Sequence, residues 1–225
     1  MGIAFQGTSI KPFLTHDIAL TIILQLPPHI QTVCRRSDPN KTELIAKHLR
    51  EGSNERTILE HLHTKQPRSP HVIQFIDATR DWLILPKLHS ICDRKLLNSR
   101  GISGRVLLGW GLIKGLAYLH EHNIAHRDVK PDNLVCDDDF CLQIIDFDVA
   151  IEVRDENTEV GEYRGTKGWT APEMGTEDGP SLMYSPIKAD RWSCGRVLQC
   201  HIMAGKGDIR LVRFAHQLMA NNPQQ

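Results

Sequence analysis

The sequence predicts an α+β protein in which a small sheet with one helix comes first and a mainly helical region follows. Three observations support this prediction. Short apolar runs separated by turn signals fill about the first 85 residues. The stretch Pro86–His89 then breaks the pattern. From residue 104 onward, apolar residues recur at helical spacing over a long stretch.

The first part of the chain is expected to form strands around one helix. The strand-like runs are residues 19–26 (a buried strand or a short helix), 32–36, 43–49, 72–76 and 82–85. The turn signal Ser37–Asn40 makes the second and third runs a hairpin. The polar residues Asp77–Asp81 are expected to join the last two strands. A helix is expected over Glu55–His63, with its N-cap within Gly52–Asn54.

The remainder of the chain is expected to be mainly helical. A helix over about 104–121 is predicted by a wide apolar face made of Val106, Leu107, Trp110, Leu112, Ile113, Leu116, Tyr118 and Leu119. A short hairpin is expected at 135–145, and a last helix near 211–219. Asp190 is expected to begin another helix as its N-cap. The run Glu152–Tyr163 is too charged to pack and is expected to be mobile.

Length and composition bound the class of protein. With 225 residues, 40% of them apolar, the chain is long enough for one large domain or two small lobes. The 27 basic and 27 acidic residues cancel, so no global field favours nucleic acid or a membrane surface as partner. The apolar run 18–26 is too short to span a membrane, and the start lacks the features of a signal peptide. Six scattered cysteines without a Cys-x-x-Cys pair indicate reduced thiols in a cytoplasmic or nuclear protein.

A dense polar cluster, His126–Asn133, lies between two apolar elements. Such a cluster predicts a rigid loop where chemistry is often sited. Within it, Asp128 is a candidate proton acceptor and Lys130 a candidate to neutralise a developing phosphate charge. Asn133 is a candidate metal ligand, and Asp146, at the end of an apolar run, is a second one.

Four motifs in this order resemble the eukaryotic protein kinase family. They are His126-Arg127-Asp128 with Lys130 and Asn133, Asp146-Phe147, Ala171-Pro172-Glu173, and Asp190-x-Trp192-Ser193-x-Gly195. The resemblance covers roughly residues 32–225 and is close over 104–198. It implies one two-lobed, protein-kinase-like domain over 1–225, with the N-lobe at about 1–86. The C-lobe is then expected at about 87–225, truncated at its C-terminal end.

The resemblance also implies roles for the polar residues. Asp128 would accept the proton of the substrate hydroxyl, and Lys130 would lie beside the transferring phosphate. A lysine at this place is similar to the Ser/Thr-specific kinases. Asn133 and Asp146 would hold Mg²⁺. The implied activity is transfer of the γ-phosphate of Mg-ATP to a serine or threonine hydroxyl of a protein substrate.

Six residues are assigned to the nucleotide site by the same resemblance: Lys47, Glu55, Leu85, Pro86, Leu88 and Val135. Lys47 and Glu55 would pair and grip the phosphates. A surface charge pair is the alternative interpretation of these two residues. Leu85 would be the gatekeeper, and the hinge Pro86–Leu88 would hold adenine through backbone groups.

The chain departs from the family pattern at five places, one of which is Ile45 in place of the small residue expected two positions before Lys47. No Gly-x-Gly-x-x-Gly is present, and only residues 48–54 separate Lys47 from Glu55. Asp148 stands where the family has glycine, which restricts the backbone and adds negative charge beside the metal ligands. The late arginine that would pair with Glu173 is absent. These departures are expected to affect mainly nucleotide binding and stability. The candidate catalytic residues and metal ligands are all present.

Two alternative functions stay open. A pseudokinase, acting as a binding or scaffold module, is favoured by the missing glycine loop and by Asp148. A small-molecule phosphotransferase of related fold shares the Asp…Asn loop, but such enzymes lack the segment 171–173 and usually the lysine at 130. For regulation, we expect that phosphorylation of Thr158 orders its segment through Arg127. Thr166 is interpreted as a structural or substrate-contacting hydroxyl.

Overall fold

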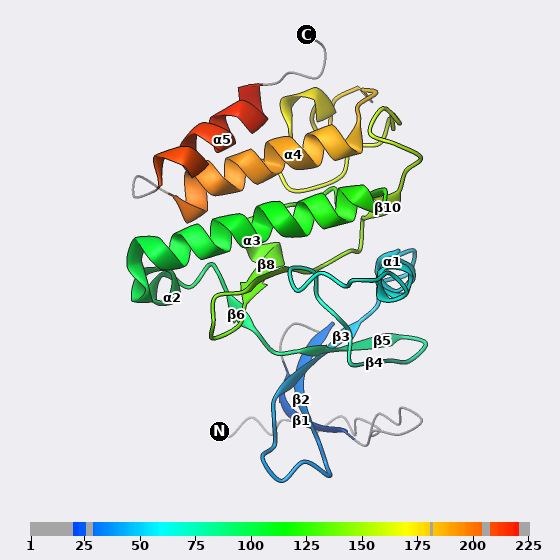
Figure 1. The fold of residues 1–225 in the computed structure, drawn as a ribbon. Helices are drawn as coiled ribbons and strands as arrows, with labels where there is room; N and C mark the ends of the chain where they lie inside the picture. The colour runs from blue at the N-terminus through cyan, green and yellow to red at the C-terminus, as the bar shows by residue number, and fades with distance from the viewer. Residues whose placement is uncertain (1–19, 26–28, 181, 204–207, 221–225) are drawn as a thin grey trace, which may run out of the picture. The chain divides into compact units, whose positions relative to one another are not determined.

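The computed structural model describes residues 20–25, 29–180, 182–203 and 208–220 (Figure 1). The chain divides into two compact units. The smaller unit contains the chain up to Leu49 together with Phe75–Lys87. The larger unit contains Arg50–Gln74 and the chain from Leu88 onward. Helix α1 (Glu55–His63) therefore belongs to the larger unit, although the sequence places it among the strands.

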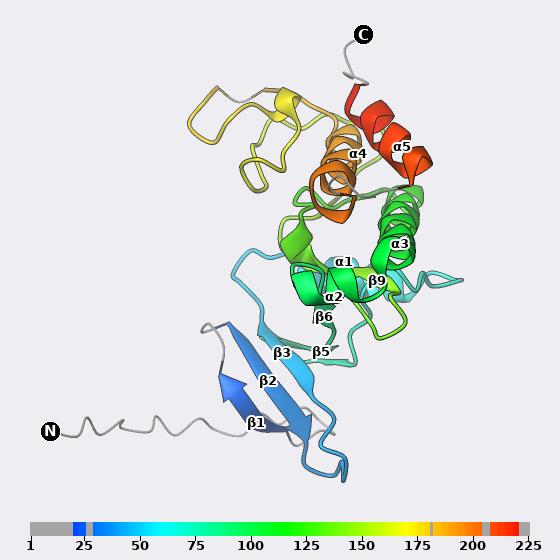
Figure 2. The ribbon, with the colours of Figure 1, turned by 90° about the vertical axis from the view of Figure 1, so that its left-hand side faces the viewer.

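The smaller unit is a five-stranded antiparallel sheet with the order β1-β2-β3-β5-β4. Its strands are β1 (Leu20–Gln25), β2 (Ile30–Arg35), β3 (Leu44–His48), β4 (Asp77–Ala78) and β5 (Trp82–Pro86). Figure 2 shows β1, β2 and β3 side by side. Val33, Leu44 and Ile84 pack together in one buried cluster. The predicted turn after β2 is confirmed, because the Asp38 carboxylate accepts hydrogen bonds from two amides that follow it.

The strand predicted at 72–76 is wrong. Val72 makes only an isolated bridge to Ile144, and the short strand β4 falls inside the stretch expected to be a turn. Val72 and Ile73 are each 1% exposed, whereas Ile76 is 40% exposed, so the start of the run is buried and its end is not. A short apolar run signals burial, and its spacing cannot distinguish a strand from another buried segment.

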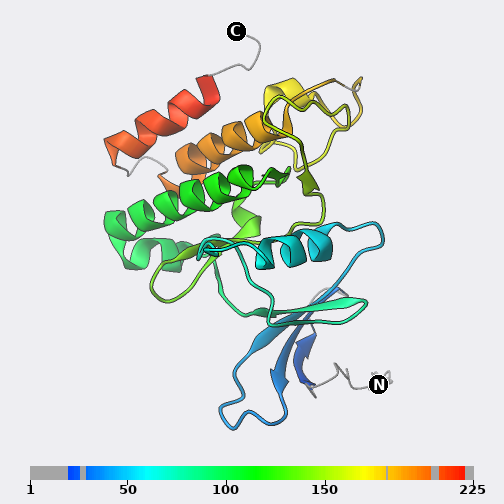
Figure 3. The ribbon, with the colours of Figure 1, turned by 45° about the vertical axis from the view of Figure 1, so that its right-hand side comes forward.

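The larger unit is mainly helical. Its helices are α1, α2 (Arg94–Ser99), α3 (Gly101–Glu121), α4 (Pro186–Val197) and α5 (Ile209–Ala220), with 3-10 helices at Pro131–Asn133 and Pro172–Met174 and a π-helix at Leu198–Ile202. Its short strands are β6 (His89–Ser90), β7 (Ile124–Ala125), β8 (Leu134–Cys136), β9 (Leu142–Ile144) and β10 (Ile151–Glu152). They form the sheets β6-β8-β9 and β10-β7. Figure 3 shows α3, α4 and α5, in green, orange and red, running beside one another.

Helix α3 carries the centre of the core. Leu108, Leu112 and Leu119 are fully buried, and each contributes roughly 1.5–3 kcal/mol on removal from water. The predicted helix is confirmed, but its buried face is narrower than predicted. Leu107 is 50% exposed and Trp110 is 45% exposed, because the spacing that points to α4 and β9 excludes these two positions.

Helix α4 begins earlier than predicted. Pro186 occupies its first turn, and the Ser185 side chain accepts a hydrogen bond from the Lys188 amide as the N-cap. Asp190 lies inside the helix and is 1% exposed, so the prediction that it caps the helix is wrong. A buried carboxylate in mid-helix requires polar partners, and those partners lie in another part of the unit.

The charged run 152–163 packs, contrary to expectation. Val153 is buried, and Val160 and Tyr184 exchange two backbone hydrogen bonds of 3.0 and 3.1 Å. The Ser185 hydroxyl donates to the carbonyl of Glu156 at 2.6 Å. The valines between the charges find apolar partners, and backbone carbonyls are satisfied by side-chain donors, so the charged residues need not enter the core.

The state of the thiols agrees with the composition. All six cysteines are free, as their spacing predicts. Burial raises the pKa of Cys194 to about 12, so this thiol stays protonated. No helix within the described ranges combines the length and the apolar character that crossing a membrane requires.

Candidate functional site

The His126–Asn133 stretch forms the predicted loop, between β7 and β8. We refer to it as the 126–133 loop. Val129 and Pro131 are buried, which anchors the middle of the loop while its polar side chains project elsewhere. Pro131 begins a single 3-10 turn, and Asn133 at its end is 4% exposed. The loop is therefore fixed at both ends and at its centre.

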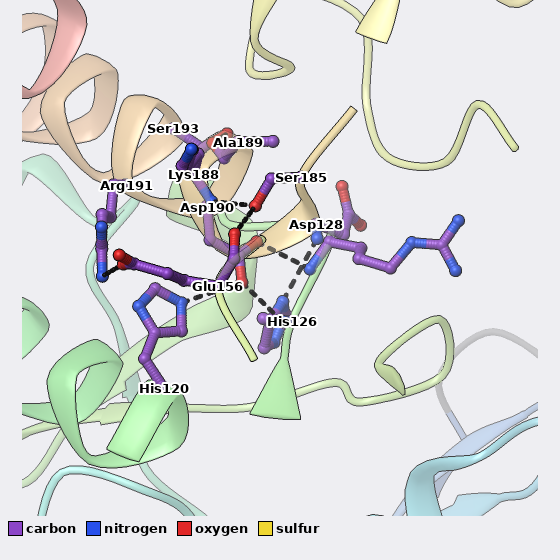
Figure 4. Close-up of polar contacts among 11 residues, drawn as sticks. His120, His126, Asp128, Glu156, Ser185, Lys188, Ala189, Asp190, Arg191 and Ser193 are labelled. Carbon is purple, nitrogen blue, oxygen red and sulfur yellow. Dashed lines mark hydrogen bonds and ion pairs between the residues drawn. The ribbon is translucent and has the colours of Figure 1, made fainter. Parts of the chain in front are cut away.

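Asp190 supports this loop through its backbone (Figure 4). One oxygen of the Asp190 carboxylate accepts from the His126 amide at 2.6 Å, and the other accepts from the Arg127 amide at 2.8 Å. Arg127 has φ 68, a left-handed conformation that costs a non-glycine residue roughly 1–2 kcal/mol. Charge-assisted hydrogen bonds from a buried carboxylate offset that cost.

His120 is a further support that the sequence interpretation missed. Its Nε2 lies 3.3 Å from the Asp190 carboxylate, and its side chain is 9% exposed (Figure 4). His120 is therefore largely buried at this contact. His120 lies on α3 and Asp190 lies on α4. Their contact follows from the packing of these two helices, which the local sequence does not indicate.

Asp128 lies at the centre of a compact polar cluster. The Lys130 ammonium is 2.8 Å from one carboxylate oxygen, and the Thr166 hydroxyl donates to the other at 2.8 Å. Lys130 Nζ also donates to the Thr166 hydroxyl at 2.7 Å. Asn133 Nδ2 donates to the backbone carbonyl of Asp128 at 2.9 Å and to its carboxylate at 3.1 Å. The structure thus brings together the three residues Asp128, Lys130 and Asn133, and adds Thr166.

Gly165 is what allows Thr166 to reach Asp128. Its φ is 115, which L-residues with side chains rarely adopt. A Cβ at this position would lie 2.7 Å from the carbonyl oxygen of Arg127. The backbone at Gly165 therefore lies closer to the backbone at Arg127 than a residue with a side chain would permit.

The segment after β9 places Asp146 beside the loop. The Ile145 amide donates to the carbonyl of Asn133 at 3.0 Å, and the Ile145 carbonyl lies 3.0 Å from His126 Nε2. Asp146 has φ 67, a second left-handed position in this region. The rings of Phe147 and His126 meet edge to face at 5.0 Å. The two candidate metal ligands, Asn133 and Asp146, are thus carried by neighbouring backbone segments.

Three carboxylates gather at this segment. Oxygen atoms of Glu55, Asp146 and Asp148 lie within 4.8 Å of one another. The Phe147 amide also donates to Glu55 Oε1 at 3.3 Å. Oxygen donors of this kind suit a hard divalent cation such as Mg²⁺. The two hydrogen bonds from the Asn133 side chain to Asp128 both use Nδ2 as the donor. They do not involve the side-chain carbonyl oxygen of Asn133.

Arg127 reaches the charged segment. Its Nη2 donates to the Glu162 carbonyl at 3.1 Å and lies 3.5 Å from the Glu162 carboxylate. Tyr184 donates to the same carbonyl at 2.8 Å, and burial raises the pKa of Tyr184, which keeps its hydroxyl a donor. A hydrogen bond from Arg164, with the charges of Arg164 and Arg127, lowers the pKa of Glu162.

A polar cavity of about 490 Å³ adjoins Arg127. It is lined by Arg50, Glu51, Gly52, Ser53, Asn54, Arg127, Asp148, Val149, Ile151, Glu162 and Arg164. Thr158 is not part of this lining, and its hydroxyl donates to Asp155 at 3.4 Å. The pairing of a phosphate on Thr158 with Arg127 stays a prediction.

The six nucleotide-site candidates fall in both units. In the smaller unit, Lys47 on β3 pairs with Leu83, Leu85 on β5 pairs with Ile45, and Pro86 ends β5. In the larger unit, Glu55 begins α1, Leu88 precedes β6, and Val135 lies at the centre of β8. Each candidate has a defined place in its own unit, and their assignment to one nucleotide site stays a prediction.

Comparison with known proteins gives one family. The sequence model of the protein kinase domain matches residues 38–208 of the chain. Serine/threonine-protein kinase GRIK2 of Arabidopsis thaliana is 37% identical over 92 residues, which are 41% of this chain and 22% of that protein.

Two further relatives are kinases by name. Mitogen-activated protein kinase kinase kinase 13 of Homo sapiens is 31% identical over 165 residues, 69% of this chain and 16% of that protein. Serine/threonine-protein kinase BCK1/SLK1/SSP31 of Saccharomyces cerevisiae is 42% identical over 98 residues, 42% of this chain and 6% of that protein. The matched stretches thus span less than a quarter of each of these relatives.

Proposed function

The chain belongs to the protein kinase domain family, and from that premise we propose that it is an ATP-dependent serine/threonine protein kinase. As one domain over residues 1–225, it would transfer the γ-phosphate of Mg-ATP to a hydroxyl of a protein substrate. The observation that carries the proposal is the cluster of a carboxylate, an ammonium and a hydroxyl at Asp128, Lys130 and Thr166. This arrangement suits a reaction in which a hydroxyl loses a proton while a phosphoryl group arrives.

In the proposed reaction, the Asp128 carboxylate accepts the proton of the substrate hydroxyl. The hydroxyl oxygen forms a bond to the γ-phosphorus as the bond to the β–γ bridging oxygen breaks, and ADP leaves. Lys130, 2.8 Å from Asp128, places its positive charge where negative charge develops on the transferring group. A positioned general base contributes roughly 10²–10⁴ to the rate.

Asn133 and Asp146 are the residues we propose to hold Mg²⁺. Bound Mg²⁺ would neutralise phosphate charge in this chemistry. The donor set fits, because the Asn133 carbonyl oxygen is not used in its hydrogen bonds to Asp128 and Asp146 supplies a carboxylate. The backbone hydrogen bond between Ile145 and Asn133 keeps the two ligands on adjoining segments.

For the nucleotide we propose the six residues that the family pattern selects: Lys47, Glu55, Leu85, Pro86, Leu88 and Val135. Lys47 would bind phosphate oxygens, with Glu55 as its partner. Leu85 would contact the adenine edge, and the backbone of Pro86–Leu88 would supply the polar contacts to the base.

A protein is the proposed phosphate acceptor. The segment Ala171-Pro172-Glu173 resembles the family's peptide-docking segment, and the relatives named above are protein kinases by name. Equal numbers of basic and acidic residues give no field that favours nucleic acid or a membrane. Free cysteines fit a cytoplasmic or nuclear setting.

The test is transfer of labelled phosphate from Mg-ATP to a general protein substrate, comparing the chain with Asp128→Asn. We expect labelling by the unchanged protein and a loss of at least about 100-fold in the variant. Equal labelling from both proteins would overturn the proposal. Circular dichroism of both proteins provides the control for folding.

A second candidate, a pseudokinase that binds partners without catalysis, is favoured by the absence of a Gly-x-Gly-x-x-Gly. Thermal unfolding with and without Mg-ATP distinguishes the two, because a ligand that binds only the folded state raises the Tm. A kinase should show a raised Tm and turnover. Absence of both favours the pseudokinase.

A further inference from the structure

Helix α1 begins abruptly. Glu55 is its first residue, and only residues 48–54 separate it from Lys47 on β3. The side chain of the N-cap residue, Asn54, makes no capping hydrogen bond. A helix start without a cap leaves amides unsatisfied and frays easily, so another group must fix the position of Glu55.

The fixing contacts come from residues 147–150. The Ser53 hydroxyl donates to Asp148 Oδ1 at 2.8 Å, and the Asn54 amide donates to the Asp148 carbonyl at 3.3 Å. Asn54 Nδ2 donates to the Ala150 carbonyl at 3.0 Å. In the reverse direction, the Phe147 amide donates to the Glu55 carboxylate at 3.3 Å. Four hydrogen bonds therefore join residues 53–55 to residues 147–150.

Ser53 is the link between the carboxylate and the helix. Its hydroxyl oxygen accepts from the Glu55 amide at 3.2 Å while its hydrogen goes to Asp148. Ser53 thus satisfies a free amide of the first helical turn, and Asp148 orients the hydroxyl that does so. A carboxylate at a helix N-terminus is also stabilised by the helix dipole.

We propose that Asp148 is a positioning residue, which holds Ser53 and through it the start of α1, so that Glu55 stays beside residues 146–147. This inference rests on the proposed kinase function only for its effect on turnover. Asp148 stands where the family has glycine, and it is not among the residues with positive φ, so the freedom of glycine is not needed here. The replacement supplies a carboxylate contact that glycine cannot make.

The other contacts of Asp148 also lead toward the start of α1. One carboxylate oxygen accepts from Ser53, and the other lies 3.5 Å from Arg50 Nε. One oxygen therefore accepts a hydrogen bond and the other forms an ion pair, in both cases with a residue that precedes α1. The charge of Asp148 is offset by Arg50, which reduces its repulsion of the neighbouring Asp146 and Glu55 carboxylates.

The experiment compares four variants with the unchanged chain: Asp148→Gly, Asp148→Asn, Ser53→Ala and the double variant Ser53→Ala/Asp148→Gly. Glu60→Gln is the matched control, since Glu60 is exposed on the same helix and pairs with Arg56. Two quantities are measured. The first measurement gives kcat and KM for Mg-ATP. The second is amide hydrogen exchange of the whole chain, followed over residues 50–60, and it needs no turnover.

Asp148→Gly and Ser53→Ala should each speed exchange at the start of α1 about tenfold and lower kcat/KM about tenfold. The double variant should lose clearly less than the product of the two single losses, because both changes remove the same hydrogen bond between Ser53 and Asp148. Asp148→Asn keeps an oxygen acceptor for Ser53 and should lose less than about threefold. Glu60→Gln should leave exchange at residues 50–56 unaltered.

The inference is overturned if Asp148→Gly leaves exchange unaltered. It is also overturned if Asp148→Asn loses as much activity as Asp148→Gly and changes the Mg²⁺ requirement while exchange stays the same. That pattern would identify Asp148 as a metal ligand. If the unchanged chain shows no turnover, the proposed function fails, and the exchange data still decide whether Asp148 positions α1.

Discussion

The 126–133 loop and the charged run 152–163 follow each other in the larger unit but are held in different ways. The loop rests on one buried carboxylate, Asp190, which accepts from two consecutive amides. The charged run is held by several separate contacts near the surface, among them Ser185 with Glu156 and Arg127 with Glu162. The difference indicates that two consecutive amides of the loop share one acceptor, whereas the contacts of the charged run are spread over several residues.

The largest effect should come from Asp190→Ala, which tests the dependence of the loop on one group. Two buried amides lose their acceptor, and the left-handed conformation of Arg127 loses its support. We expect a loss of roughly 3–5 kcal/mol in the free energy of unfolding, measured by urea denaturation. Asp132→Asn, on an exposed residue of the same loop, serves as control. A loss below about 1 kcal/mol would show that the loop has other support.

Gly165 follows the charged run in the sequence and lies against the carbonyl of Arg127 in the 126–133 loop. Gly165→Ala should have the next largest effect. The new Cβ would lie 2.7 Å from the Arg127 carbonyl, which adds to the strain of φ 115. We expect a loss of about 2 kcal/mol in stability, together with a drop in turnover as Thr166 moves from Asp128. Gly168→Ala is the matched control, because Gly168 has φ 89 with nothing within 4 Å. Equal losses in both variants would contradict a role for the close approach.

Ser185→Ala tests a single contact of the charged run. The variant loses the N-cap of α4 and the donor to the Glu156 carbonyl, and we expect it to lose about 1 kcal/mol of stability. Ser193→Ala in the same helix is the comparison. The Ser193 hydroxyl only donates back to the Ala189 carbonyl at 3.0 Å, and such bonds add little to a helix (Figure 4). If thermal denaturation shows Ser193→Ala to be the worse variant, the capping role of Ser185 is wrong.

The smallest effect concerns the Glu162 ion pairs and pH. The pKa of Glu162 lies below its ordinary value of 4.5, so its contribution to stability is complete above about pH 4.5. That contribution is lost as the pH falls through the lowered pKa, because protonation removes the attraction to Arg164 and Arg127. Glu162 is 56% exposed, so screening by water keeps the effect small. The difference in Tm between the unchanged chain and Glu162→Gln should shrink on acidification below about pH 4.

Features with a strong local signal were predicted from the sequence. The bounds of α1, the long helix α3 and the hairpin β8–β9 follow from apolar spacing and turn residues. The grouping of Asp128, Lys130 and Asn133 follows from their closeness in the chain. The family and the fold class rest on motifs whose order the sequence displays directly.

Features that depend on long-range packing were not predicted. Asp190 resembles an N-cap locally, and only its burial against the 126–133 loop reveals its role. His120 resembles a solvated residue until α3 and α4 pack together. Asp148 departs from the family pattern in the sequence itself, but its contact with Ser53 spans 95 positions of sequence. Glu173 was expected to lack its usual arginine, and it makes no ion pair with any residue in the described part of the chain.

The Asp190 contacts have a consequence for how the protein is assembled. They connect residues 63 and 64 positions apart, and the acceptor follows the loop in the chain. During synthesis, the loop amides therefore leave the ribosome before their acceptor exists, and closing so long a span is slow compared with forming a local helix. The backbone geometry of the loop is completed only once α4 has docked against α3. The hydrogen-bonded arrangement around Asp128 should therefore be among the last features acquired during folding.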